Sequence, residues 1–347
     1  MNSQEKLLKD LEMLEETQLF VNVDRDGVKL NDWAQTHRDE INEWLSRRGA
    51  LVLRGLKVMA SRQFGQLLEI LFNGSLLPYS HRSTPRTELR GNVYTATEYH
   101  SEQLIQQHNE QAYTNVWPMR IGFFCMLPSD VGGETPIADS RIIYEKIPLS
   151  IREEFESKGV LYVRNYSELD LPWNEVFCTE NKVEVEQYCN ENNIEFEWLS
   201  NNGLRTKQLL PATAIHPHTK EKLWFNQAHL FHVSALGADI QRELINSKGK
   251  ENLPRNTYFG DGTEISDEIV AVISKIYELH KIKFEWNKGD VMLLDNMLFS
   301  HGRESFRGER KVLVGMAIPN VASDIPVSSA AHIQSAQTEK ETESLLV

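Results

Sequence analysis

Cysteine is scarce in this chain. Its 347 residues include three cysteines, Cys125, Cys178 and Cys189, an odd number with no C-x-x-C pair. Such a set supplies neither the framework of a small disulfide-stapled protein nor the ligands of a zinc ribbon. We therefore expect a fold that depends on its hydrophobic core, in a reducing compartment such as the cytoplasm.

Long apolar runs and an excess of basic residues are missing as well. No stretch approaches the roughly 18 consecutive apolar residues of a membrane span. Residues 1–18 alternate charged and apolar side chains, unlike the apolar centre of a signal peptide. The 50 acidic residues outnumber the 37 basic ones, and the net charge of −13 disfavours a polyanionic partner. The sequence thus predicts a cytoplasmic protein that binds neither membranes nor nucleic acid.

The first part of the chain predicts two helices around one strand. Trp33, Ile41 and Trp44 recur at roughly helical spacing before Gly49, a residue that commonly ends a helix. The apolar run ALVLRGL follows as a strand, and Ser61 is the expected N-cap of the second helix. The apolar face of that helix consists of Phe64, Leu67, Leu68 and Leu71.

Beyond Gly91 the sequence changes to short aromatic and β-branched runs separated by turn signals, which is typical of a mostly antiparallel β core. An acidic, helix-prone stretch, VEVEQYCNENNIEFEWL, lies in a segment of about 141–205 that we interpret as an insertion over this core. KQLLPATAI and KLWFNQAHLF are expected to be strands joined by the turn HPHTKE. We expect solvent exposure for the two histidines of this turn, His216 and His218.

The last third of the domain begins with the clearest amphipathic helix, SDEIVAVISKIYELHK, with Ser266 as its N-cap. Two strand-length apolar runs follow, FEWNKGDVMLLDN and RKVLVGMAIPN, and the loop MLFSHGRESFRGE separates them. We expect one domain over residues 1–325 and a disordered tail over 326–347. The apolar face of the helix is expected to consist of Ile269, Val272, Ile273 and Ile276.

Three dispersed residues have the pattern of a metal site. His108 and Glu110 are two positions apart, and His301 lies far downstream between two apolar strands. Residues i and i+2 of a strand point to the same side, so His108 and Glu110 could reach one ion. Two histidines and one carboxylate form the facial triad of non-haem iron enzymes, which leaves three coordination positions open.

Several motifs in order resemble one family. HNE, then GGETPIADSR, then GDVMLLDNMLFSHGRESFRGERKVLV, over about residues 20–325, are similar to the taurine dioxygenase-like (TauD/TfdA) Fe(II)/2-oxoglutarate oxygenases. The sequence segments RTELRGNVYTATEY and WPMRIGFFC resemble those of the SyrP-like branch of this family. The resemblance implies a mostly β, α+β fold, the cupin-like jelly-roll or double-stranded β-helix with flanking helices. It also implies Fe(II), 2-oxoglutarate and O₂ as cofactors.

The resemblance assigns further residues. His108, Glu110 and His301 match the iron ligands, Thr135 matches the threonine that holds 2-oxoglutarate, and Arg310 matches the arginine that grips its far carboxylate. A guanidinium suits this task because its planar fork donates two parallel hydrogen bonds. The nearby Arg307 is the competing arginine, and we prefer Arg310 because it stands at the start of a strand. Asn226, His229 and Arg307 are candidate substrate contacts.

The resemblance also implies the reaction. Oxidative decarboxylation of 2-oxoglutarate to succinate and CO₂ would be coupled to hydroxylation of an unactivated C–H bond. Many relatives have Asp where this chain has Glu110, and halogenating relatives have Gly or Ala there, so the carboxylate favours hydroxylation. The branch suggests the β-carbon of an amino acid, free or tethered to a carrier protein, in natural-product biosynthesis. A basic patch for such a carrier could consist of His81, Arg82, Arg86 and Arg90.

Two other functions remain open at this point, as does a homo-oligomer. A non-catalytic jelly-roll could bind a small ligand, although it would not need Thr135 and Arg310 together. A zinc hydrolase could use the histidines of the HPH and AHLFH segments, which include His229 and His232. Retention of zinc after His108→Ala would favour the hydrolase.

Overall fold

The computed structural model describes residues 19–79, 84, 86–167 and 170–321. The charged segment at the N-terminus, the tail predicted for 326–347, and His81 and Arg82 of the proposed basic patch lie outside these residues. In the part that is described, no helix has both the length and the apolar character needed to cross a membrane.

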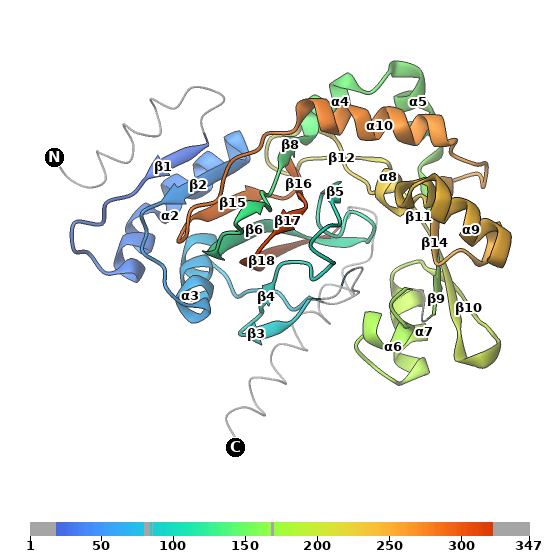
Figure 1. The fold of residues 1–347 in the computed structure, drawn as a ribbon, viewed down its shortest axis with the longest axis horizontal. Coiled ribbons are helices and arrows are strands. Elements are labelled where there is room, and N and C mark those ends of the chain that lie inside the picture. The colour runs from blue at the N-terminus through green and yellow to red at the C-terminus, as the bar shows by residue number, and fades with distance from the viewer. Residues whose placement is uncertain (1–18, 80–83, 85, 168–169, 322–347) are drawn as a thin grey trace.

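A seven-stranded sheet forms the centre of the molecule (Figure 1), with the strand order β1-β2-β15-β6-β18-β4-β3. Its neighbouring strands are antiparallel except for the parallel pair β1 and β2. The longest strands, β6 and β18, pair along most of their length. The bounds are β1 Phe20–Asn22, β2 Ala50–Arg54, β3 Glu88–Arg90, β4 Val93–Thr95, β6 Val116–Leu127, β15 Val291–Asp295 and β18 Lys311–Val321.

Both faces of the sheet are buried at its central strands β2, β15 and β6, and successive residues alternate between them. In β15, Val291 and Leu293 pack into the core beneath the N-terminal helices, whereas Met292 and Leu294 pack into a second core on the opposite face. A strand covered on both faces appears in the sequence as a continuous apolar run rather than as an alternating one. This explains why VMLLD is uniformly apolar up to its last residue.

Two helices, α2 (Leu30–Arg48) and α3 (Ser61–Phe72), cover one face of the sheet. The predicted apolar face of α3 is confirmed, because its four members are fully buried. Gly49 ends α2 in a left-handed conformation with φ of 84°, as expected, and its N–H donates to Leu45 O. The N-cap prediction for Ser61 was wrong by one position, since Ala60 is the N-cap and makes no side-chain hydrogen bond there.

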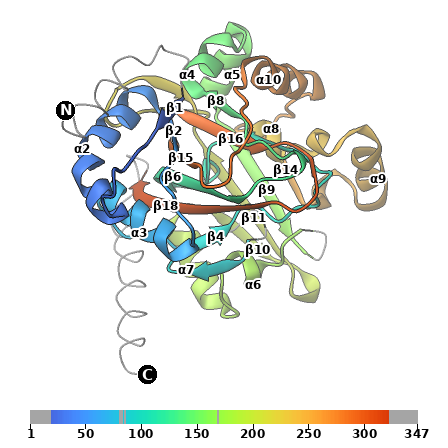
Figure 2. The same ribbon diagram turned by 60° about the vertical axis from the view of Figure 1, so that its left-hand side comes forward.

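The opposite face carries a three-stranded sheet of order β5-β16-β8, seen beside the central sheet in Figure 2. The two layers form the predicted jelly-roll, and helices flank it. A short pair, β7 with β17, extends the rim next to this sheet. The bounds are β5 Ile105–His108, β7 Val131–Gly132, β8 Ile137–Asp139, β16 Phe299–Arg303 and β17 Phe306–Arg307.

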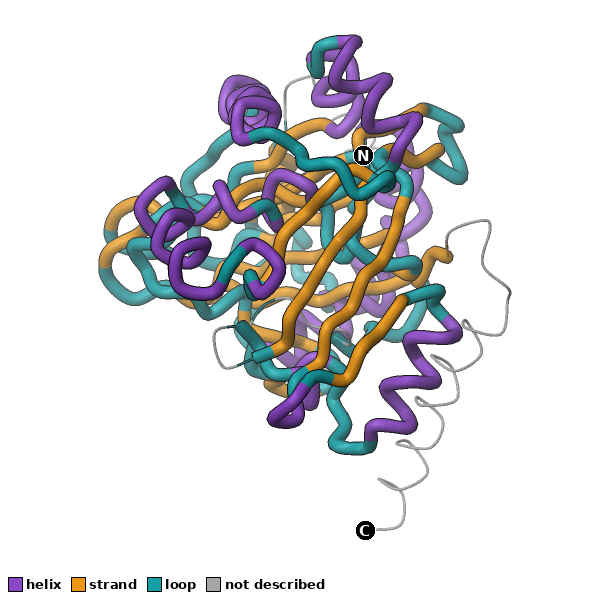
Figure 3. The backbone as a smooth tube through the Cα atoms, turned by 90° about the vertical axis from the view of Figure 1, so that its right-hand side faces the viewer, coloured by secondary structure: helices purple, strands orange, loops and turns teal. Residues whose placement is uncertain are grey.

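A separate four-stranded antiparallel sheet lies at the far side of the molecule, with the order β10-β11-β9-β14, and Figure 3 views the chain from this side. The segment of about 141–205 supplies β9 and β10, whereas β11 begins at the end of this segment and β14 comes from later in the chain. The stretch expected to be helix-prone divides into helix α7 (Lys182–Glu191) and strand β10. The sheet bounds are β9 Val160–Tyr166, β10 Glu195–Trp198, β11 Leu204–Leu210 and β14 Arg255–Phe259.

The remaining elements are a short hairpin and the helices that connect the jelly-roll with the four-stranded sheet. Strands β12 (Thr213–Ile215) and β13 (Lys222–Trp224) form the predicted hairpin. The expected strand through AHLF was wrong, because these residues form the short helix α8. The helices are α4 Ser140–Lys146, α5 Leu149–Lys158, α6 Trp173–Val176, α7 Lys182–Glu191, α8 Ala228–Phe231, α9 Ala238–Lys248 and α10 Asp267–His280, and the 3₁₀ turns are Ser200–Asn202, Val233–Leu236 and Lys250–Asn252.

Helix α10 is the amphipathic helix predicted from the sequence. Ser266 is its N-cap and accepts a hydrogen bond from the N–H of Ile269, as expected. The buried face is rotated from the predicted one, because Val270 and Tyr277 are buried while Val272 is 38% exposed. The prediction for Val272 was therefore wrong: several apolar residues lie close together in the sequence of this helix, and its packing against α4 and α8 decides which of them are covered.

A buried polar cluster joins the hairpin to the central sheet. Asp295 ends β15 and accepts hydrogen bonds from Arg120, from Nε2 of His216 at 3.1 Å, and from the N–H groups of Met297 and Leu298. The prediction that His216 is exposed was wrong, since its exposed fraction is zero, whereas His218 is exposed as expected.

Asp295→Asn is expected to destabilise the fold strongly, because it leaves the buried guanidinium of Arg120 without its counter-charge. Breaking a buried ion pair by removing one partner costs about 3–5 kcal/mol. Asp39→Asn is the matched control, since the exposed pair of Asp39 with Arg38 should contribute less than about 1 kcal/mol. Equal midpoints of urea unfolding for the two variants would contradict this role of Asp295.

Candidate active site

His108 and His301 face each other from two neighbouring strands. His108 is the last residue of β5, His301 lies in β16, and the two are direct partners in the antiparallel pairing. Their ring centroids are 4.6 Å apart, and the ring of Phe123 lies 5.0 Å from that of His301. The pairing of β5 with β16 thus brings together histidines that are far apart in the sequence.

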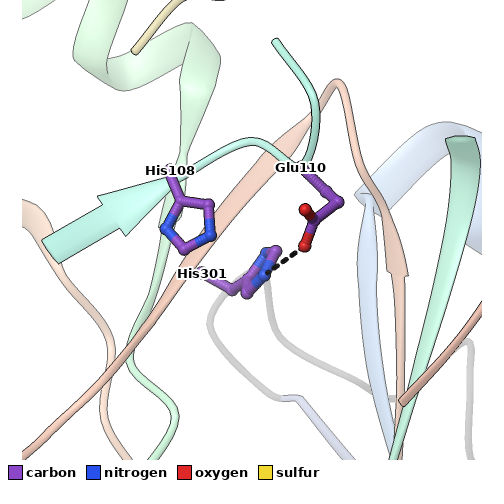
Figure 4. Close-up of side chains that lie close together, drawn as sticks. All are labelled: His108, Glu110 and His301. Atoms are coloured by element: carbon purple, nitrogen blue, oxygen red, sulfur yellow. Dashed lines mark ion pairs between the residues drawn. The ribbon is translucent and has the colours of Figure 1, made fainter. Parts of the chain in front are cut away.

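Glu110 joins them from a turn (Figure 4). Glu110 is not on the same strand as His108, contrary to the prediction from strand alternation, because β5 ends at His108 and Glu110 follows in a tight turn. Asn296 holds this turn: its Oδ1 accepts from the N–H of Glu110 at 2.7 Å, and its Nδ2 donates to the carbonyl of Glu110 at 2.9 Å. Asn109 adds a second anchor, since its side chain donates to Asn296 O at 2.7 Å.

Both imidazoles have the electrostatics of metal ligands. Burial lowers the pKa of His108, and burial together with repulsion from His108 and Arg86 lowers the pKa of His301 well below its usual value. Both rings are therefore neutral near pH 7, so the 3.8 Å approach of His301 Nε2 to Glu110 Oε2, dashed in Figure 4, is no charge pair. Nδ1 of His108 donates to Gln106 O at 2.8 Å, which leaves the lone pair on Nε2.

The three side chains fit a divalent cation. One ligand atom from each lies within 4.8 Å of the others, and all three residues are buried. Nδ1 of His301 is a buried polar atom without a hydrogen-bond partner among the described residues. Two neutral nitrogens and one carboxylate oxygen on one side of an ion form the donor set of a facial triad.

Thr135 and Arg310 lie side by side at the same cavity. Arg310 precedes β18, donates from Nε to Gly133 O at 2.8 Å, and donates from Nη2 to Oγ1 of Thr135 at 3.3 Å. Nε1 of Trp286 donates to the same hydroxyl at 3.1 Å. Because Thr135 accepts twice, its own O–H is directed to a further acceptor. Burial, and then repulsion from Arg303, lower the pKa of Arg310 to about 10, so it is charged and suited to an anion.

A single cavity collects these groups. Of the sequence-predicted site residues, His108, His301, Thr135 and Arg310 line it, and Glu110 lies at its edge through its contacts with His301 and Arg86. The space measures about 30 Å³, which suits an ion or a water, so larger ligands require lining side chains to shift.

The structure places the three candidate substrate residues elsewhere. Arg307 is exposed on β17 and does not line the cavity. Asn226 is buried, and both ends of its amide are hydrogen-bonded within the protein. Nδ2 donates to Ala212 O, and Oδ1 accepts from the N–H of Ala228. His229 donates from Nε2 to Gln107 O at 3.0 Å, stacks on Tyr277, and lines a second cavity of about 410 Å³ beneath α10.

Two cavity residues escaped the sequence reasoning. Arg303 lines the cavity and donates to four backbone carbonyls, those of residues 97, 99, 100 and 103, so it ties this loop to β16. Arg303 could have been predicted from its position two residues after His301, because residues i and i+2 of a strand point to the same side. Arg86, proposed for a surface patch, is buried: its Nη2 donates to Oε2 of Glu110 at 2.6 Å. That part of the carrier-patch prediction was wrong, whereas Arg90 is exposed.

The histidines of the zinc hydrolase alternative do not converge. His216 is bound to Asp295, His218 is exposed, His229 donates to Gln107 O, and Nδ1 of His232 contacts Oγ of Ser234. Within the described ranges, the group of potential metal ligands that comes together is the one around His108. The structure thus gives the hydrolase no metal site.

Comparison with known proteins identifies the family. Residues 14–317 match the family described as "Taurine catabolism dioxygenase TauD, TfdA family". The chain is 44% identical over 280 residues to the dapdiamide synthesis protein DdaC of Enterobacter agglomerans, covering 80% of this chain and 85% of that protein. It is 31% identical over 294 residues to the clavaminate synthase-like protein At3g21360 of Arabidopsis thaliana, covering 81% and 85%. The chain belongs to the TauD/TfdA family.

Solved structures agree on the fold. PvcB of Pseudomonas aeruginosa matches with a TM-score of 0.50 and 14% identity, covering 88% of this chain and 89% of that one. A second structure, of PvcB described as an Fe, α-ketoglutarate-dependent oxygenase from an isonitrile synthetic pathway, has a TM-score of 0.50 and 13% identity over 88% of each chain. At this identity the likeness concerns the jelly-roll alone.

The protein is therefore a 2-oxoglutarate-dependent dioxygenase. Fe(II), 2-oxoglutarate and O₂ are its cofactors, as expected for the family. Membership of this enzyme family overturns the alternative of a non-catalytic binding protein. The recognition made from the motifs, the fold class and the reaction class are confirmed.

Thr135→Val should raise the KM for 2-oxoglutarate about 10-fold or more, because a hydrogen bond to a charged group contributes about 1.5–3 kcal/mol. Valine keeps the shape but removes the hydroxyl that also orients Arg310. Thr36→Val, on the exposed side of α2, is the control. Steady-state kinetics with varied 2-oxoglutarate test this prediction, and an unchanged KM would contradict it.

Proposed function

We propose that this dioxygenase hydroxylates an unactivated C–H bond of an amino acid, at the β-carbon, in natural-product biosynthesis. The observation that carries the proposal is the buried carboxylate of Glu110 beside the two histidines. A halogenating relative would have a residue without a carboxylate there. The description of DdaC as a synthesis protein supports a biosynthetic role.

Several residues in and around the cavity have roles in this proposal. His108, Glu110 and His301 hold the iron, and Asn296 fixes the turn that presents the carboxylate. Arg310 and Thr135 hold the far carboxylate of 2-oxoglutarate, while Arg303 keeps the 97–103 loop against β16. Once bound, iron with 2-oxoglutarate and O₂ supplies the oxidising power that the side chains of a protein lack.

The substrate is either a free amino acid or one tethered to a carrier protein. Of the basic patch proposed for an acidic carrier, Arg90 is the exposed member among the described residues. The net charge of −13 does not favour docking of an acidic partner by long-range attraction.

Succinate formation with a panel of amino acids, each offered free and as a carrier-bound thioester, tests the function. A substrate should stimulate succinate release and yield a product heavier by one oxygen atom. A product that has lost two hydrogens, or one that contains chlorine, would contradict hydroxylation. Glu110→Ala is the matched variant, and it should not yield the hydroxylated product.

A further inference from the structure

Arg86 lines the cavity of the iron site and has unused hydrogen-bond donors. Its side chain is 4% exposed, and its guanidinium lies over the ring of Tyr79 at 4.4 Å from the centroid. Nη2 is taken by Glu110, but Nε and Nη1 are buried and have no partner among the described residues. A buried donor without an acceptor is unfavourable, so this arrangement suits a ligand that supplies one.

The charge balance of the cavity specifies the kind of ligand. The described residues that line it include Arg86, Arg303 and Arg310 but no carboxylate, and the neighbouring carboxylate is that of Glu110. Nη1 and Nη2 of Arg303 donate to backbone carbonyls, its Nε has no partner among the described residues, and Arg310 is placed to meet 2-oxoglutarate. Ferrous iron and 2-oxoglutarate have opposite and equal charges, so together they leave the excess of positive charge unchanged.

Arg86 is also the cation whose partner changes when iron binds. Its Nη2 donates to Oε2 of Glu110 at 2.6 Å, and both side chains are buried. If Glu110 ligates iron, it shares its charge between two cations. The guanidinium then needs another anion nearby, because an uncompensated buried charge is costly.

We propose that Arg86 binds a free carboxylate of the substrate, which places the substrate beside this guanidinium and next to the iron ligands. This inference rests on the proposed function, because it specifies the chemistry of the amino acid that is oxidised. An amino acid with a free carboxylate fits, whereas one joined to a carrier through a thioester has lost that group. Arg86 is then a specificity-determining residue for the free acid.

The carboxylate of 2-oxoglutarate is the other anion that could meet Arg86, and the two sources are separable. Arg86→Gln should raise the dissociation constant of the substrate acid about 30-fold or more, as expected when one partner of a buried ion pair is lost. Binding of 2-oxoglutarate, followed anaerobically by the visible charge-transfer band of its Fe(II) complex, should change little. A loss of 2-oxoglutarate binding with intact binding of the acid would assign Arg86 to the cosubstrate and overturn the proposal.

The experiment compares each free L-amino acid with its own carboxamide on the full-length protein. Perturbation of the charge-transfer band under anaerobic conditions reports binding, and succinate release reports turnover. In the wild type, acids should perturb the band and amides should not. Arg86→Gln should abolish this preference, Arg86→Lys should retain part of it, and Arg242→Gln, which changes an exposed arginine of α9, should leave it unchanged.

The remaining outcomes decide against the proposal in distinguishable ways. Equal responses to acid and amide, or undiminished binding of the acid by Arg86→Gln, would overturn it. Loss of the band itself in both Arg86 variants would show that Arg86 merely supports Glu110. Turnover of carrier-bound thioesters without turnover of free acids would overturn the role of Arg86 but leave the proposed function standing. Failure of both substrate forms would remove the proposed function as well.

Discussion

Arg310→Gln is expected to raise the KM for 2-oxoglutarate by about 30-fold or more, since truncating one partner of a buried charge pair costs about 2–5 kcal/mol. The prediction follows from the position of Arg310, which is bound to Gly133 O and to the hydroxyl of Thr135 at the cavity. Glutamine retains polarity but loses the charge and the planar fork that a carboxylate requires.

Arg307→Gln provides the matched control, because it removes the same charge three positions earlier on the exposed strand β17. Its KM for 2-oxoglutarate should equal that of the wild type. A large rise in KM for Arg307→Gln, with none for Arg310→Gln, would exchange the roles of the two arginines.

His301→Ala is expected to lower the affinity for Fe(II) by more than about 100-fold and to abolish succinate formation. Mutation of a residue that hydrogen-bonds to a metal ligand already lowers metal affinity or activity about 10–100-fold. The loss of a ligand itself should lower the affinity further. His218→Ala, which removes an exposed histidine, should retain iron and activity. Metal content and succinate release measured on both variants check the prediction, with circular dichroism to verify folding. Iron bound at wild-type affinity by His301→Ala would contradict it.

The metal site could be predicted from the sequence because its ligands lie within short, specific motifs. What brings the ligands together could not be predicted, because it depends on long-range pairing. His301 meets His108 through the register of β16 with β5, and Asn296 holds the backbone of Glu110 from the turn between β15 and β16. The spacing of two residues pointed to His108 and Glu110 as a pair. They come together because Asn296 holds the turn of Glu110, and not because both lie on one strand.

Two of the errors concern buried polar residues. Arg86 and His216 stand in polar stretches that are typical of exposed segments, yet both are buried against distant carboxylates, Glu110 and Asp295. A sequence shows that a residue is polar, but whether it is buried depends on a partner that the fold delivers. The strands of the central sheet were easier to predict, because burial on both faces leaves a continuous apolar run.

The most direct test of the metal site is an anaerobic titration of the wild-type protein with Fe(II) in the presence of 2-oxoglutarate. If His108, Glu110 and His301 hold one iron that the keto acid chelates, a weak visible charge-transfer band should grow and saturate at one iron per chain. A folded protein that gives no band, or a band that persists in His301→Ala, would contradict this site.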